Sequence, residues 1–326
     1  MIIPCYPDFI PLDLDLKEIL HPRLSLTFDG VSEFTFAGLY LFRKRYNYRI
    51  SRHREEGGFI ISGEQILTET SDALNEPEIT TKKTFFMTPC SMPDSETLAS
   101  LFSTHDYWKN ISDNILKQCL DNYTCEKLHE NNTETSFLIP ELNLIIEEDR
   151  DNFDYLYNRS DLAELSGKKF HKKKNHVNNF LQSYPDHEQK PMSRELIPKA
   201  IDILDRWKQN TFMRGKEGDY IAAKEALELF DSLTLKGTVF FINSKPAAYC
   251  LGESISRGRM FAIHFEKANE EYRGIYQFMN QVFAASLPRF FTLINREQDL
   301  GNEGLRQAKM TYRPCGFVKK YTGKKL

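Results

Sequence analysis

The residues best suited to chemistry lie in one stretch of the chain, NREQDLGNEGLRQAKMTYRPCGF (295–317). The apolar run at 290–295 has the length and composition of a strand, and it stops at charged and polar residues. Among these, Arg296 is suited to orient or stabilise an anionic group, and Asp299 or Glu297 to take a proton or bind an amine. A polar turn directly after a strand is typical of an active site.

A helix is expected to follow this turn. Gly301 marks the turn, Leu305, Ala308 and Tyr312 recur at helical spacing, and Pro314 ends the segment. A tyrosine with an unperturbed pKa near 10 is protonated at neutral pH, so Tyr312 is suited to donate a proton to a leaving group. The alternative interpretation is a packed aromatic residue whose hydroxyl satisfies a buried carbonyl.

Further side chains extend this candidate site. Lys309 is a candidate phosphate contact, with a surface ion pair to Glu303 as the alternative. Glu266 and Lys267 end a second predicted strand, where neighbouring side chains face opposite sides, so at most one of them reaches the site. We take Glu266 as the catalytic candidate, with a structural ion pair as the alternative. His264 shares the parity of Glu266 and is expected to be a satisfied core residue.

Lysines crowd one predicted helix, KKFHKKKNHVNNFLQSY, which follows Gly167. Phe170, Val177 and Leu181 form its apolar stripe. Five lysines within seven positions lie beside an asparagine and histidines that can contact phosphate and sugar, whereas a solvated lysine face is the alternative. The candidate phosphate contacts are Lys168, Lys169, Lys172, Lys173, Lys174 and Asn175.

Two patterns carry a resemblance to known proteins. The ending A-x-x-x-Y-x-x-x-G-F (308–317) resembles the last helix and strand of the GNAT (N-acetyltransferase) fold, in which the tyrosine often protonates the leaving group. Four segments resemble the C-terminal domain of the phosphatidylglycerol lysyltransferases and their soluble relatives of unassigned function. They are GKKFHKKKNHVNNF (167–180), HFEKA (264–268), YRGIYQFMNQVFA (272–284) and NREQDLGNEGLRQAKMTYRP (295–314), in the family's order across roughly the C-terminal half.

This resemblance implies an α/β (α+β) protein with two tandem GNAT-like domains, the first degenerate, each a central mixed sheet flanked by helices. It implies transfer of an aminoacyl group from aminoacyl-tRNA to a hydroxyl or amine acceptor, lipid head groups included, without a tightly bound cofactor. In acetyltransferases of this fold a glycine-rich turn binds the coenzyme A pyrophosphate at a helix N-terminus. Here that turn offers Arg273 and one glycine, Gly274, as donor contacts, so a coenzyme A thioester is the alternative donor.

The motifs of other transfer chemistries do not occur in the sequence. There is no G-x-S-x-G, P-loop or G-x-G-x-x-G, and no cysteine has a neighbouring histidine. We therefore expect direct transfer without a covalent enzyme intermediate. A third function, non-catalytic binding of RNA or a lipid surface, is disfavoured because a binding module needs no proton donor behind a strand end. The expected partners are a tRNA acceptor end or coenzyme A, and the membrane surface or a phospholipid acceptor.

Length and composition suit two globular domains. The chain has 326 residues, of which 40% are hydrophobic and 27% charged. Residues 1–150 carry 14 Lys and Arg against 25 Asp and Glu, whereas residues 151–326 carry 29 against 21, so the second half is better suited to a polyanion. With no apolar run of membrane-spanning length, no basic leader and no C-x-x-C pair among six cysteines, we expect a cytoplasmic protein without a metal site.

An acidic patch near residues 147–153 is the expected linker, which gives an N-terminal domain at 1–150 and a C-terminal domain at 151–326. In the first domain, strands are expected at 25–30, 33–42, 47–52, 57–63, 82–89 and 143–149, helices from Ser95 and Ile111, and a loop at 129–135. In the second, helices precede an antiparallel meander that ends at 259–268, followed by helix, strand, helix and strand. The basic series from Arg43 to Arg54 permits a nucleic-acid patch, but we interpret it as the exposed face of a sheet.

Overall fold

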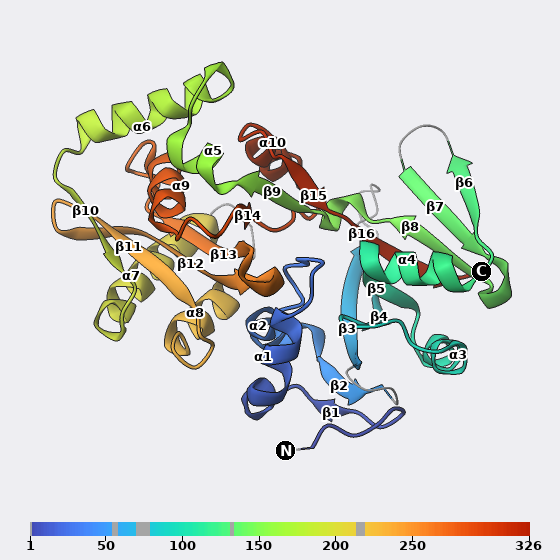
Figure 1. The fold of residues 1–326 in the computed structure, drawn as a ribbon. Helices are drawn as coiled ribbons and strands as arrows, with labels where there is room; N and C mark the ends of the chain where they lie inside the picture. The colour runs from blue at the N-terminus through green and yellow to red at the C-terminus, as the bar shows by residue number, and fades with distance from the viewer. Residues whose placement is uncertain (1, 54–57, 70–78, 131–133, 213–218) are drawn as a thin grey trace. The chain divides into compact units, whose positions relative to one another are not determined.

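The computed structural model describes residues 2–53, 58–69, 79–130, 134–212 and 219–326 of the protein. The chain forms two compact units, each with a sheet and helices packed against it (Figure 1). One unit comprises Met1–Phe153 with Val318–Leu326, and the other comprises Asp154–Phe317. The predicted α/β class is confirmed. The range expected for the second domain, 151–326, differs from the structure at its end, because residues 318–326 belong to the first unit.

In the first unit, nine strands of the described residues form one sheet in the order β1-β2-β3-β4-β5-β16-β8-β7-β6. Its strands are β1 (Ile10–Pro11), β2 (Arg49–Arg52), β3 (Phe59–Glu69), β4 (Ile79–Met87), β5 (Tyr107–Ser112), β6 (Glu126–Glu130), β7 (Glu134–Ile139), β8 (Leu144–Glu148) and β16 (Lys320–Lys325). The β4–β5 pair is parallel. β16 lies between β5 and β8 and is antiparallel to both, so a distant part of the chain completes the middle of this sheet.

Four α-helices belong to the first unit within the described residues: α1 (Lys17–Ser25), α2 (Phe36–Tyr46), α3 (Ser95–Thr104) and α4 (Asp113–Asn122). α3 and α4 pack in one hydrophobic core with the sheet, around the fully buried Trp108. Asp94 caps α3 and Ser112 caps α4 by accepting backbone N–H groups of the first turn. The helices predicted from Ser95 and Ile111 are thereby confirmed.

Two strands predicted in the first unit are wrong. Segment 33–42 belongs largely to α2, which begins where Thr35 Oγ1 accepts the N–H of Gly38 (2.8 Å) and ends at left-handed Asn47. Segment 25–30 is the end of α1 and a turn. The predicted loop at 129–135 includes the ends of β6 and β7, while residues 131–133 lie outside the described residues. The basic series from Arg43 to Arg54 was expected to form the exposed face of a sheet. This is wrong for its first members, which lie in the last turn of α2, and Arg54 lies outside the described residues.

In the described part of the second unit, seven strands form a sheet in the order β10-β11-β12-β13-β14-β9-β15. Their bounds are β9 (Asp154–Asn158), β10 (His187–Pro191), β11 (Lys236–Ile242), β12 (Lys245–Ile255), β13 (Met260–Ala268), β14 (Leu293–Asn295) and β15 (Gly316–Val318). β11, β12 and β13 form the predicted antiparallel meander, which is confirmed. β13 and β14 run parallel, with a helix in the connection between them.

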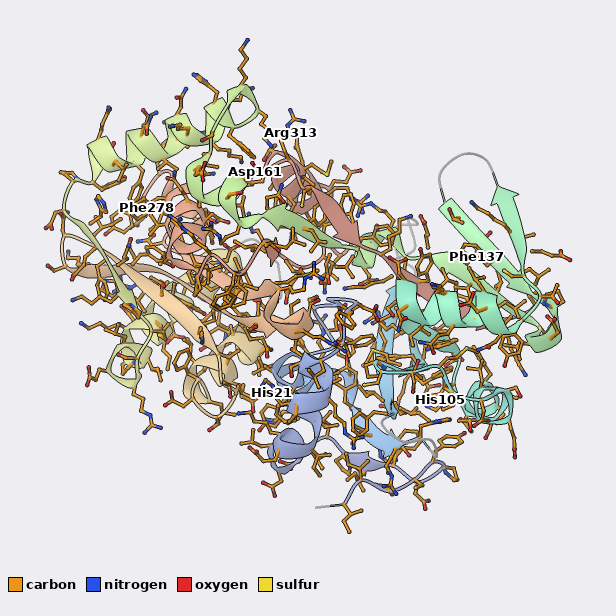
Figure 2. All side chains as sticks on the ribbon, viewed as in Figure 1. His21, His105, Phe137, Asp161, Phe278 and Arg313 are labelled. Carbon is orange, nitrogen blue, oxygen red and sulfur yellow. The ribbon has the colours of Figure 1, made fainter. Side chains whose placement is uncertain are left out.

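Helices cover both faces of the second sheet. They are α5 (Arg159–Glu164), α6 (His171–Ser183), α7 (Ile197–Phe212), α8 (Tyr220–Glu228), α9 (Ile275–Ser286) and α10 (Glu303–Met310). α5, α6 and α9 share one core with Ala248 and Cys250 of β12, and Phe278 of α9 belongs to it (Figure 2). Phe180 of α6 stacks on Phe278 with ring centroids 4.4 Å apart. The alternate residues of β12 are also buried, and α7 contacts β12 and β13. None of the described helices is both long and apolar enough to cross a membrane.

Candidate active site

The candidate site lies where the parallel strands β13 and β14 part. Their pairing has three positions and its last is Ala262 with Asn295, where β14 ends, whereas β13 continues to Ala268. A β-bulge makes His264 the extra residue of β13, since Leu251 pairs with Phe265 and Gly252 with Ile263. The turn after β14 therefore places its side chains beside the free end of β13, as the sequence predicted for residues 296–299.

Arg296 bridges the separated strands. Its Nη2 donates to Oε2 of Glu266 on β13 at 2.6 Å. Its guanidinium carbon lies 5.1 Å from the ring centre of Tyr312 and 5.8 Å from that of Tyr157. Burial opposes the charged form, but Glu266, Tyr157 and Tyr312 together outweigh burial and raise the pKa of Arg296 further above its ordinary value. Nε and Nη1 are buried and make no hydrogen bond within the described residues, so this cation retains unused donors.

Tyr312 follows α10 directly and is 6% exposed. Its ring meets that of Tyr157 edge to face, with centroids 6.4 Å apart. Burial raises the pKa of Tyr312 to about 12, and Arg296 opposes this shift. The phenol is therefore protonated at neutral pH and stands beside a buried guanidinium. Of the predicted stripe, only Tyr312 is buried, because Leu305 and Ala308 lie on the exposed side of α10.

Lys173 is the one lysine of the basic helix that reaches this cluster. Its Nζ lies 4.0 Å from the ring centre of Tyr312. Burial, together with the positive charge of Arg296, lowers the pKa of Lys173 to about 8. The sequence carried a signal for this position, since Phe170, Lys173, Val177 and Phe180 follow one another at three- and four-residue steps. The predicted stripe instead ended at Leu181, which is 37% exposed.

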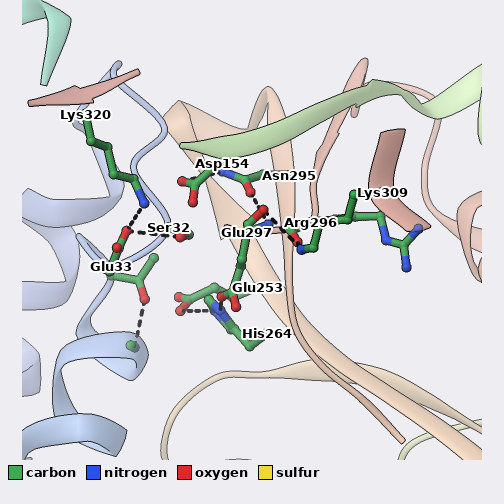
Figure 3. A network of polar contacts seen from close by, with 12 residues as sticks. Ser32, Glu33, Asp154, Glu253, His264, Asn295, Arg296, Glu297, Lys309 and Lys320 are labelled. Atoms are coloured by element: carbon green, nitrogen blue, oxygen red, sulfur yellow. Dashed lines mark hydrogen bonds and ion pairs between the residues drawn. The ribbon is translucent and has the colours of Figure 1, made fainter. Parts of the chain in front are cut away.

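The turn that carries Arg296 is held in an unusual backbone conformation. Glu297 and Leu300 both have positive φ angles, 57° and 53°. The side chain of Asn295 accepts the N–H of Glu297 at 2.7 Å and donates to Asp154 Oδ2 at 3.0 Å, and both Asn295 and Asp154 are fully buried (Figure 3). Strained residues of this kind persist where surrounding contacts fix them, most often at functional sites.

Asp299 is committed to structure. It is fully buried, and its carboxylate accepts Nε and Nη2 of Arg306, the hydroxyl of Tyr155 and the N–H of Gly301, all within 2.9 Å. Burial opposes ionisation, but these donors outweigh it and lower the pKa of Asp299 to about 2. With its lone pairs engaged, this carboxylate is poorly suited to take a proton, so the geometry does not support the base predicted here.

Lys309 and Glu297 are likewise engaged. Nζ of Lys309 donates to the backbone carbonyls of Arg296 and Glu297, which fixes the turn and leaves this lysine poorly placed for the phosphate role predicted for it. Glu297 Oε1 accepts Nδ1 of His264 at 2.7 Å, and Glu253 accepts Nε2 of the same ring at 3.0 Å (Figure 3). Burial disfavours the charged ring, yet the two carboxylates prevail and raise the pKa of His264 to about 10.

Glu266 and Lys267 point to different surroundings, as strand geometry predicted. Glu266 reaches Arg296, whereas Lys267 pairs with Asp219 at 2.5 Å and lies 3.6 Å from the ring centre of Trp207. Sequence reasoning missed Tyr157, whose hydroxyl donates to the carbonyl of Lys309 at 2.9 Å. It belongs to β9, and nothing near it in the sequence connects it to residues 296–312.

The remaining predicted donor contacts lie outside this cluster. Residues 168–176 are helical, as predicted, and Lys168, Lys172, Lys174 and Asn175 are exposed. Lys169 is also exposed and pairs with Asp161 of α5 at 3.0 Å. Arg273 is exposed in the turn before α9. Gly274 has a φ of 91°, and a Cβ there would lie 3.1 Å from the backbone oxygen of His176, so this glycine allows α9 to approach α6.

The two sheets with flanking helices, and the parallel strands that part at the candidate site, define a tandem GNAT-like protein. A crystal structure described as the C-terminal domain of a lysylphosphatidylglycerol synthetase from Agrobacterium fabrum has this fold: the TM-score is 0.55, with 12% identity, over 96% of this chain and 93% of that one. The chain belongs to the family "Phosphatidylglycerol lysyltransferase, C-terminal", which matches residues 96–323. The family predicted from the four sequence segments is thereby confirmed.

Two further relatives are similar over different lengths. A conserved protein of unknown function from Bacteroides thetaiotaomicron superimposes with a TM-score of 0.79 and 26% identity, and all of both chains is covered. An uncharacterised protein of Mycoplasmoides gallisepticum is 27% identical over 184 residues, which is 54% of this chain and 57% of that protein. The chain thus matches little more than half the length of this curated relative.

Proposed function

We propose that this chain is an aminoacyltransferase that moves an aminoacyl group from aminoacyl-tRNA directly to a hydroxyl or amine acceptor. Membership of the lysyltransferase family supports an aminoacyltransferase-like function in general. The observation that carries the proposal is the placement of Tyr312 against Arg296 where β13 and β14 part, with Lys173 linking this place to the exposed lysines of α6. The lysines of this arrangement suit a polyanionic donor, and Tyr312 suits a leaving group that must gain a proton.

The proposed reaction breaks the ester between the aminoacyl carbonyl carbon and the ribose oxygen of the tRNA. The acceptor oxygen or nitrogen bonds to that carbon and loses its proton. Tyr312 gives its phenol proton to the departing ribose oxygen. Arg296 favours the negative charge that develops on the carbonyl oxygen, because a buried cation acts strongly in a site of low dielectric constant.

Glu266 supports this site from β13. One carboxylate oxygen accepts Nη2 of Arg296 and fixes the guanidinium, while Oε1 makes no hydrogen bond within the described residues. We assign that second oxygen to the α-ammonium group of the aminoacyl donor, which needs a carboxylate partner when it leaves water.

The acceptor is proposed to be a phospholipid head group or another hydroxyl or amine at the membrane surface. The family and the A. fabrum domain are both named for phosphatidylglycerol, and that is the support for a lipid acceptor here. A coenzyme A donor is less well supported, because the turn before α9 has one glycine and a backbone carbonyl of α6 packs against it.

The proposal is tested by incubating the protein with a mixture of aminoacyl-tRNAs and either phosphatidylglycerol vesicles or a set of small hydroxyl and amine compounds, and by identifying aminoacylated products by mass spectrometry. A parallel reaction contains acetyl- and longer acyl-coenzyme A thioesters in place of tRNA. We expect product from at least one aminoacyl-tRNA. Acylation from the thioesters alone, or no transfer from any aminoacyl-tRNA to lipid, hydroxyl or amine acceptors, would overturn the proposal.

Binding of the donor is tested separately through the exposed lysines of α6. Replacing Lys168, Lys172 and Lys174 with Gln should flatten the salt dependence of tRNA binding by roughly one unit of the logarithmic slope for each lost phosphate contact. The matched control replaces two exposed lysines at the ends of other elements, Lys236 and Lys245, and should leave the slope unchanged. Equal slopes in all three proteins would contradict a tRNA-binding role for α6.

A further inference from the structure

The carboxylates and the histidine at the candidate site are each held by another group. Asp299 is held by Arg306 and Tyr155, Glu266 by Arg296, and Glu297 by His264. A carboxylate that faces a fixed cation or several donors loses affinity for a proton. The imidazole of His264 is itself enclosed by two carboxylates and stays protonated. The proton that leaves the acceptor therefore needs another destination.

Lys173 differs from these groups because no carboxylate of the described residues pairs with it. Its Nζ lies over the ring of Tyr312, and the charged group that affects it is another cation, Arg296. Lys309 is similarly close to Arg296, but its Nζ is engaged with two backbone carbonyls. An amine that is partly removed from water and next to a guanidinium is the usual environment of a lysine that works in its neutral form.

We propose that Lys173 is the general base of the transfer reaction, and that it works as a pair with Tyr312. This inference rests on the proposed function. The neutral amine of Lys173 takes the proton from the acceptor as the new bond to the carbonyl carbon forms. Tyr312 loses its proton to the ribose oxygen as the ester bond breaks. The net charge of the pair does not change in the overall step, because one proton enters the pair and one leaves it.

Contact between the two side chains also restores the enzyme. After transfer, Lys173 is an ammonium that carries the acceptor's proton and Tyr312 is a phenolate, so moving one proton from Lys173 to Tyr312 returns both to their starting forms. Nζ of Lys173 lies 4.0 Å from the ring centre of Tyr312, so the two side chains are close together. A side-chain rotation or one water molecule can therefore pass the proton from Lys173 to Tyr312. The acceptor class that fits such a base is a primary alcohol or a neutral amine, each of which loses one proton as it bonds to the carbonyl carbon.

The kinetic test compares two arginine substitutions. Lys173→Arg keeps the positive charge but cannot supply a neutral amine, and we expect kcat/KM to fall on the order of 10²-fold or more. Lys236→Arg changes an exposed lysine at the start of β11, outside α6, and should retain wild-type activity. For the wild type, kcat/KM should rise with pH up to about 8 and then level off, because the reactive form of Lys173 is the deprotonated one. tRNA affinity should be similar in all three proteins.

A second measurement needs no reaction. In protein labelled with ¹³C and ¹⁵N in lysine, the Nζ signal of Lys173, identified by its loss in Lys173→Arg, should titrate at about pH 8, below the ordinary value for lysine. Titration of Lys173 at the ordinary value, or full activity of Lys173→Arg, would overturn the base and leave the proposed function intact. Absence of transfer by the wild type from every aminoacyl-tRNA would instead overturn the proposed function, and the base with it.

Discussion

Tyr312 combines two properties that a proton donor requires, a phenol that stays protonated at neutral pH and a position beside a buried cation. Tyr312→Phe retains the ring that packs against Tyr157 and removes the proton. We expect turnover to fall on the order of 10²-fold or more with little change in donor affinity, measured by single-turnover kinetics. Tyr157→Phe is the matched control, because its hydroxyl supports a backbone carbonyl and its loss should lower stability more than turnover. Unchanged single-turnover rates in Tyr312→Phe would exclude the donor role.

His264 makes stability depend on pH at the same site. Its folded pKa is raised to about 10 from an ordinary value of 6.5, so its ion pairs stabilise the fold fully below pH 6.5 and are lost as pH rises through 10. The difference in unfolding free energy between wild type and His264→Gln should therefore shrink as pH rises from 6 to 10, measured by urea unfolding. His171→Gln changes an exposed histidine of α6 and should show no such trend. A difference that stays constant over this range would contradict the double ion pair.

The residue types of the site could be identified from the sequence, but their roles could not. Arg296, Glu266 and Tyr312 meet as predicted because strand and helix periodicity fixes their directions. Asp299 is engaged by Tyr155, which lies 144 residues away, and no local pattern reveals such a partner. The position of Lys173 could have been predicted from helical periodicity, because this residue occupies the buried stripe of α6. Its charge instead suggested the exposed face of the helix.

Gly274 illustrates how one element restricts another. Its φ of 91° is costly for any other residue, and a Cβ would also meet the backbone of α6 at 3.1 Å. Gly167 has a similar φ of 82°, but a Cβ added there would meet open space. Both Gly→Ala changes should destabilise the second unit, and Gly274→Ala by about 1 kcal/mol more, measured by urea unfolding. If the two variants lost equal unfolding free energy, α6 would have to move away from the new Cβ without loss of stability.

Prediction of elements succeeded for the apolar strands of the meander and failed in parts of the first unit. The meander β11 to β13 follows its pattern closely. In α2, Phe36, Ala37, Leu39, Tyr40 and Leu41 are all buried, so the segment lacks the polar face that identifies a helix, and its aromatic content favoured a strand. The hairpin of β6 and β7 carries polar residues that are equally common in loops, and its partners became clear only in the sheet.

β16 gives the whole molecule an unusual dependence on residues 320–326. It occupies the middle of the first sheet, its buried Lys320 pairs with Glu33, and the hydroxyl of Tyr321 donates to Asp113 at 2.9 Å. Deleting residues 320–326 should remove the cooperative unfolding of the first unit, because β5 and β8 lose their shared neighbour. Hydrogen exchange should then show lost protection in β5 and β8 but retained protection in β11 to β13. Deleting Leu326 alone is the control, and retained protection after the longer deletion would refute this role.

The place of β16 also reverses the order in which the two units are completed during translation. Proteins usually fold their first domain while the next is still being made. Here the first sheet lacks its middle strand from the time Glu148 is synthesised until Lys320 leaves the ribosome, on the order of ten seconds or more at ordinary elongation rates. The second unit, made within that interval, has all of its strands by residue 318. The nascent first unit therefore exposes the unpaired edges of β5 and β8 to chaperones and to other chains, so aggregation during synthesis is a hazard of this topology.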